Sequence, residues 1–201
     1  MAGHSSPGEH PQRYRVFVAI VLPETVKDAI EDVQSELRSA LPAASIRWTR
    51  REQFHLTLRF LGAVDISQIE RLNESVRQAC SGVGELQMTA AGLGVFPGVR
   101  RPRVVWAGID DRGGRLAILQ RAIETATHAF TAEPPEDRFT GHVTLARCRE
   151  INRGESATLA GLVGRTASRS FGSWTASEVD VIRSETLPSG SRYTTLARVR
   201  L

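Results

Sequence analysis

Apolar residues along the chain fall into short runs whose period changes from one segment to the next. Residues 14–22 (YRVFVAIVL) form a nearly unbroken apolar run, which is typical of a strand buried on both faces. Pro23 follows, and the chain then carries apolar residues at helical spacing up to Pro42: Val26, Ile30, Val33, Leu37 and Leu41. This part of the sequence therefore predicts a strand followed by an amphipathic helix.

The rest of the chain alternates between extended and helical patterns in the same way. Helical spacing predicts three more helices, at 65–79, 114–130 and 156–165, the first with Asp65 as its N-cap. Extended patterns predict seven more strands, at 46–49, 54–62, 85–97, 103–110, 139–149, 178–186 and 192–201. The turn-like segments 98–102 and 187–191 make two hairpins of the strands beside them. Hairpins without strict strand–helix–strand alternation predict an α+β fold with antiparallel sheets.

The first thirteen residues differ from everything that follows. Residues 1–13 carry Gly, Pro and Ser without any apolar period, so they predict a disordered N-terminal tail. His4 and His10 lie there, and we expect neither to take part in chemistry. We expect residues 14–201 to form a single domain, because a chain of 201 residues can bury one substantial core.

One four-residue pattern occurs twice, as HLTL at 55–58 and as HVTL at 142–145. Side chains alternate between the two faces of an extended strand. His55 therefore shares a face with Thr57, and His142 shares a face with Thr144. The alternate positions around the first motif are apolar and are expected to face the core: Phe54, Leu56, Leu58 and Phe60.

Paired histidines with nearby hydroxyls suit one reaction in particular, the cleavage of a phosphodiester. A neutral imidazole accepts a proton from water, and a protonated one donates a proton to the leaving oxygen. Hydroxyls and an arginine can hold the phosphate oxygens, so no metal is required. The plainer alternative is that both histidines are partly exposed strand residues. A zinc site is a poorer fit, because two histidines supply too few ligands.

Composition adds little to this picture. The net charge of +4 makes an anionic partner plausible, but Lys27 is the only lysine, and a codon bias toward arginine explains that ratio better than RNA binding does. Cys80 and Cys148 have neither disulfide-framework nor zinc spacing. No apolar run approaches the length of a membrane span, and no cleavage pattern marks a signal peptide, so we expect a cytoplasmic protein.

Further segments accompany the two motifs: RVFVAIVLP at 15–23, IRWTRREQFHLTLRFLG at 46–62, GLGVFPGVRRPRVVWAGI at 92–109 and SETLPSGSRYTTL at 184–196. With these, residues 14–200 resemble the two-histidine (2H) phosphoesterases. Within that superfamily they are similar to the bacterial RNA 2′,3′-cyclic phosphodiesterases, which are also called 2′-5′ RNA ligases.

The resemblance implies a bilobal fold in which two antiparallel sheets with flanking helices surround a central groove. It implies hydrolysis of a 2′,3′-cyclic phosphate at an RNA 3′ end to a 2′-phosphate, without a cofactor or metal. His55 would be the proton donor and His142 the proton acceptor, and Thr57 and Thr144 would bind phosphate. Arg147 matches an arginine that the family places near the phosphate. Strict alternation puts Arg147 on the face opposite His142, so a bulge or a long reach must bring it in.

The resemblance also leaves open points. Gly141 stands where relatives commonly carry proline, and glycine would loosen the entry to the strand. Trp48, Trp106, Phe17 and Tyr193 could stack bases or pack in the core. Arg100, Arg101 and Arg103 could rim the groove or serve solubility.

The expected partners are RNA 3′ ends with a cyclic phosphate, with tRNA fragments among the candidates, and the expected state is a monomer. Two other functions fit the same groove. One is hydrolysis of a small cyclic nucleotide derivative. The other is an RNA-end binding or 2′-5′ ligating module.

Overall fold

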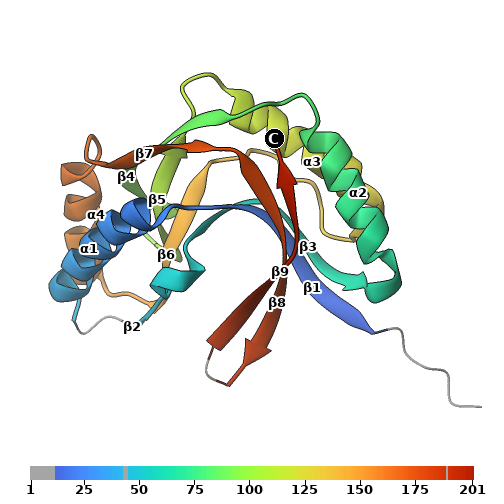
Figure 1. Ribbon diagram of the computed structural model, residues 1–201. Coiled ribbons are helices and arrows are strands. Elements are labelled where there is room, and N and C mark those ends of the chain that lie inside the picture. The colour runs from blue at the N-terminus through green and yellow to red at the C-terminus, as the bar shows by residue number, and fades with distance from the viewer. Residues whose placement is uncertain (1–11, 43–44, 189) are drawn as a thin grey trace, which may run out of the picture.

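The computed structural model describes residues 12–42, 45–188 and 190–201, and its strands join in one curved antiparallel sheet (Figure 1). Eight strands follow the order β7-β4-β5-β6-β3-β1-β8-β9, and β2 pairs with β6. Their bounds are β1 (Arg13–Val21), β2 (Ser45–Trp48), β3 (His55–Asp65), β4 (Leu86–Phe96), β5 (Val104–Asp110), β6 (His142–Glu150), β7 (Ser170–Ala176), β8 (Glu178–Leu187) and β9 (Gly190–Arg200). The α+β class and the antiparallel pairing expected from the sequence are confirmed.

Within the described residues, four α-helices pack on the sheet in two pairs. Figure 1 shows α1 (Glu24–Ala40) and α4 (Arg153–Arg165) together on one side of the molecule, and α2 (Ile69–Cys80) and α3 (Arg115–Thr127) together on the other. Each pair of helices lies over one half of the sheet. No helix in the described part of the chain is both long and apolar enough to cross a membrane.

The two halves of the sheet are joined by one bridging residue pair. Strands β3 and β6 are bridged only by Leu56 and Val143. The resemblance implies two antiparallel sheets, and this bridge joins them edge to edge into one. Each half keeps its own extensive pairing, since β3 also pairs along β1 and β6 also pairs along β5.

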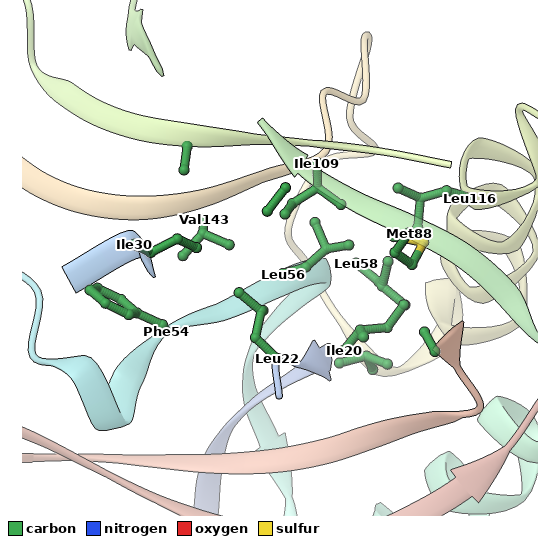
Figure 2. Packing of buried hydrophobic residues seen from close by; sticks show 14 of the residues in the cluster. Ile20, Leu22, Ile30, Phe54, Leu56, Leu58, Met88, Ile109, Leu116 and Val143 are labelled. Carbon is green, nitrogen blue, oxygen red and sulfur yellow. The ribbon is translucent and has the colours of Figure 1, made fainter. Parts of the chain in front are cut away.

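A continuous apolar core lies behind the motif strands (Figure 2). Leu56 and Val143 are fully buried, and Figure 2 shows them among Leu22, Ile30 and Ile109. Burying side chains of this size contributes about 1.5–3 kcal/mol each. The buried apolar side chains of the two motifs therefore fix which face of each strand carries the histidine and the threonine.

Some boundaries differ from those that the sequence predicts. Gly62 does not end strand β3, which continues to Asp65. Gly62 adopts a φ of 66° at a register shift in the pairing with β1, so it belongs to a bulge within the strand. Asp65 caps a short 3₁₀ turn before α2 rather than the helix itself. Strand β6 begins at His142 rather than at residue 139.

The sequence pattern does not predict strand β7. Strand β7 forms an edge of the sheet, and its burial alternates only weakly. At the other end of the fold, β1 already includes Arg13, which the sequence assigns to the tail. His4 and His10 lie outside the described residues.

Candidate active site

The two motifs are brought together by the pairing of their own strands. Leu56 and Val143, which bridge β3 and β6, occupy the same place in their two motifs. Extending this antiparallel register by one residue each way sets His55 opposite Thr144 and Thr57 opposite His142. All four side chains line one cavity of about 290 Å³. The site therefore has an approximate twofold symmetry that runs between its two strands.

A bulge in β6 places Arg147 in the same cavity. In the pairing with β5, Val105 lies opposite Ala146 but Trp106 lies opposite Thr144, which leaves Leu145 as an extra residue. Leu145 and Ala146 are consequently both buried. The next side chain returns to the open face, and Arg147 lines the cavity. Of the two possibilities that the sequence leaves open for Arg147, a bulge or a long reach, the structure has the bulge.

Strand β3 carries the same bulge at the equivalent residue. In the pairing with β1, Val18 lies opposite Arg59 and Ala19 lies opposite Thr57, so Leu58 is the extra residue. Arg59 is then buried, with 6% of its surface exposed, and Phe60 faces the cavity with 38% exposed. The sequence interpretation that placed Phe60 in the core is therefore wrong. Simple alternation fails there because the bulge reverses the faces.

Each histidine is held in one tautomer by a backbone carbonyl. His55 Nδ1 lies 2.7 Å from the carbonyl oxygen of Gln53, and His142 Nδ1 lies 2.7 Å from that of Thr140. A carbonyl oxygen can only accept a hydrogen bond, so Nδ1 carries the hydrogen in both rings. Nε2 is left as the nitrogen that can exchange protons with a ligand.

Aromatic rings flank both histidines. The ring centroid of His55 lies 4.8 Å from that of Phe17 and 5.5 Å from that of Tyr193. The ring centroid of His142 lies 5.2 Å from that of Phe96 and 6.2 Å from that of Trp106. Contacts with these rings therefore restrict the orientation of both imidazoles.

The sequence leaves open whether four aromatic side chains face a ligand or pack in the core. Phe17 and Tyr193 line the cavity, as Trp48 does, whereas Trp106 packs beside His142 and is not a lining residue. The Trp106 ring lies across Gly94, where a Cβ would stand 2.1 Å from its nearest atom. Glycine at that position makes room for the ring.

Burial lowers the pKa of both histidines. For His55 the pKa falls to about 4; loss of solvent is the largest cause, and the charge of His142 acts in the same direction. The pKa of His142 is also lowered, first by burial and then by the positive charge of Arg147. The backbone acceptors oppose these shifts. The free site therefore favours two neutral imidazoles at neutral pH.

The cavity is positively charged. Arg15, Arg47 and Arg147 line it, and no carboxylate does so among the described residues. None of the three makes an ion pair with a described acidic side chain. Unneutralised arginines around a small cavity attract an anion. Arg100, Arg101 and Arg103 are not among the lining residues.

Gly141 has a packing role beside His142. Its carbonyl oxygen accepts a hydrogen bond of 2.9 Å from Ile109 N, and a Cβ on Gly141 would stand only 2.6 Å from the carbonyl oxygen of Ile109. Real Cβ atoms do not approach backbone so closely. The glycine lets β5 pack against the entry to β6, an effect that the sequence pattern does not reveal.

In the described part of the chain no group of three or more His, Cys, Asp and Glu side chains is placed to hold a metal ion. Cys80 and Cys148 are both buried free thiols. Burial raises the pKa of the Cys80 thiol to about 11, and it also raises that of Cys148.

This chain is similar to known phosphoesterases in both sequence and fold. The family described as LigT like Phosphoesterase matches residues 20–106. An RNA 2′,3′-cyclic phosphodiesterase of Methanothermobacter thermautotrophicus is 31% identical over 189 residues, covering 94% of this chain and all of the relative. The crystal structure of TT0787 of Thermus thermophilus is similar with a TM-score of 0.75 and 26% identity, covering 93% of this chain and 97% of that one. The structure of E. coli LigT complexed with 3′-AMP has the same fold, with a TM-score of 0.74 and 23% identity over 94% of this chain and 99% of the other.

Proposed function

This chain belongs to the LigT-like phosphoesterases, and we propose that it hydrolyses the 2′,3′-cyclic phosphate at an RNA 3′ end to a 2′-phosphate. The observation that carries this proposal is the meeting of the two motif strands at equivalent residues. It gathers two imidazoles and two hydroxyls in a cavity that also holds three arginines. An anionic phosphodiester fits that set of groups.

The reaction needs one proton acceptor and one proton donor. His142 Nε2 takes a proton from water as the water oxygen attacks phosphorus. The bond between phosphorus and the 3′-oxygen breaks, and His55 Nε2 gives its proton to that oxygen. The products are a 2′-phosphate and a 3′-hydroxyl, and the two histidines end with their protonation states exchanged. No metal takes part in these steps.

The lowered pKa of His55 bears on this assignment. In the free site burial disfavours the imidazolium form, so a donor at that position must gain its proton together with the substrate. The negative charge of a bound cyclic phosphate stabilises the imidazolium. His55 therefore becomes an acid only when a substrate is present.

The hydroxyls and Arg147 supply the remaining contacts. Thr144 lies opposite His55 and Thr57 opposite His142 in the strand register, so each histidine has a hydroxyl neighbour from the other motif. These hydroxyls can donate to the non-bridging phosphate oxygens, and Arg147 offsets the charge that builds on them. Preorganised donors of this kind contribute about 2.7–4 kcal/mol each to transition-state stabilisation.

We propose RNA 3′ ends, with tRNA fragments as one source, as the partners of a monomeric, cytoplasmic enzyme with a single domain over residues 14–201. The alternatives are a phosphodiesterase for small cyclic nucleotide derivatives and a module that binds or joins RNA ends. Parallel incubation with 2′,3′-cyclic AMP tests the first alternative, and the oligonucleotide assay below tests the second.

The test incubates the protein in EDTA with an oligonucleotide that ends in a 2′,3′-cyclic phosphate and identifies the product by ³¹P NMR. We expect a 2′-phosphate as the product. In the variants His55→Asn and His142→Asn, we expect kcat to fall by about 10²–10⁴-fold. Tight binding without turnover would favour the binding module. A 3′-phosphate product would contradict the assigned roles, and loss of activity in EDTA would contradict the metal-free reaction.

A further inference from the structure

Phe60 and Arg15 form an unusual pair at one end of the cavity. Both line it, and the guanidinium carbon of Arg15 lies 5.5 Å from the centroid of the Phe60 ring. Phe60 belongs to the few large apolar side chains of the described residues that are exposed to solvent. Around the pair, Phe17 lies opposite Phe60 in the pairing of β1 with β3, and Ser184 lies opposite Arg15 in the pairing of β1 with β8; both line the cavity.

The opposite end of the cavity has a different chemistry. Arg147 takes the place in its motif that Phe60 takes in the other, and Arg47 lies directly opposite Arg147 in the pairing of β2 with β6. Two arginines thus stand beside the second motif. A single cyclic phosphate at the centre would be served by the histidines, the threonines and these arginines. It would leave the Arg15–Phe60 pair without a function.

The Arg15–Phe60 pair offers the two contacts that a nucleotide needs. Arg15 makes no ion pair with a described acidic side chain, so its charge is available to a phosphodiester. Phe60 and the guanidinium plane provide surfaces on which a base can stack. Stacking of one base on an aromatic side chain is worth about 1–3 kcal/mol.

We propose that the Arg15–Phe60 pair binds the nucleotide that precedes the terminal one in an RNA chain. The proposal rests on the proposed function of the same cavity. An RNA longer than one nucleotide continues from the 5′-oxygen of its terminal nucleotide through a phosphodiester, and this group and the base beside it match the pair. The protein then distinguishes an RNA end from a free cyclic mononucleotide by this contact.

The experiment compares a dinucleotide ending in a 2′,3′-cyclic phosphate with 2′,3′-cyclic AMP. For Phe60→Leu and for Arg15→Gln, we expect kcat/KM for the dinucleotide to fall about tenfold, which corresponds to about 1.4 kcal/mol of lost binding energy. The mononucleotide loses about twofold or less. The preference for the dinucleotide over the mononucleotide therefore falls at least about fivefold in either variant.

Arg13→Gln is the matched control. Arg13 lies on the same strand as Arg15 but does not line the cavity, so its loss removes one positive charge without touching the pair. We expect the preference ratio to stay at the wild-type value. Thermal unfolding of all three variants checks that each is folded.

Equal losses on both substrates would overturn the proposal, because the pair would then serve the terminal nucleotide. No loss on either substrate would overturn it as well. Calorimetric binding of 2′-AMP and of a dinucleotide ending in a 2′-phosphate provides a readout that does not need turnover. If the wild-type protein hydrolyses neither substrate, the proposed function fails, while a Kd ratio that falls in the two variants still supports the subsite.

Discussion

The two motif strands have the same bulge at equivalent residues, but the side chains that follow the bulge differ. In β3 the bulge is followed by Arg59, which is buried, and Phe60, which faces the cavity; in β6 the same positions hold Ala146 and Arg147. Each strand thus carries one arginine at its bulge, but the first points inward and the second outward. The catalytic groups are symmetric, and the contacts around them are not. The repeated backbone conformation places the reacting groups. Of the two arginines, we expect Arg59 to contribute to stability and Arg147 to substrate binding.

The largest difference between the two arginines should appear in catalysis. Arg147→Met removes the charge beside the phosphate, so we expect kcat/KM to fall about 10²–10³-fold while the free energy of unfolding changes by less than about 0.5 kcal/mol. Steady-state kinetics and urea unfolding measure the two quantities. Arg147→Lys, which keeps the charge but not the planar fork, should recover part of the loss. Wild-type activity in Arg147→Met would exclude a contact with the phosphate.

Arg59 should behave in the opposite way. Its guanidinium pairs with Glu124 at 2.9 Å and donates to the carbonyl oxygens of Glu133 and Pro134 at 2.8 Å each. The Glu124 side chain is only 16% exposed, so Arg59→Met would leave a carboxylate with little solvent and without its ion-pair partner, retaining only the hydrogen bond that Glu136 N donates at 2.8 Å. We expect the free energy of unfolding to fall by about 3–5 kcal/mol.

A second substitution separates charge from packing at this site. Combining Arg59→Met with Glu124→Leu removes the stranded charge and should restore much of the stability. If Arg59→Met alone is as stable as the wild type, the buried pair contributes nothing, and the contrast with Arg147 fails.

A smaller effect is expected at the entry to the second motif. Gly141→Ala places a Cβ against the carbonyl of Ile109, which forces the backbone beside His142 to shift. Such overpacking costs about 1–3 kcal/mol of stability, and kcat should fall with it. Urea unfolding and kinetics check both. Gly98→Ala is the control, because nothing lies within 4 Å of a Cβ there. Equal behaviour of the two variants would contradict the close packing.

Much of this arrangement could be read from the sequence because it depends on local pattern. Alternation put His55 with Thr57 and His142 with Thr144, and the two hairpins followed from turn residues between apolar stretches. The bulges could not be read, since an extra residue is defined only by the strand opposite. Requiring one for Arg147 and applying the same shift to the first motif would have placed Arg59 inside and Phe60 outside.

Two further features depended on long-range structure. The bridge between Leu56 and Val143 sets the geometry of the site, yet nothing within either motif specifies its partner. Strand β7 was missed because it is an edge strand with exposed Ser173 and Thr175, so only its pairing with β4 makes it a strand. In both cases the missing information is tertiary.

The central claim is that both imidazoles act on one bound phosphate, and an NMR titration of the histidine ring nitrogens tests it most directly. In the free protein burial should hold the pKa of His55 near 4 and that of His142 below its ordinary value of 6.5. Bound 2′-AMP adds negative charge beside both rings, which favours the imidazolium forms, so we predict that both pKa values rise. A saturating ligand that leaves either pKa unchanged would show that this ring does not contact the phosphate, and the two-histidine mechanism would be wrong.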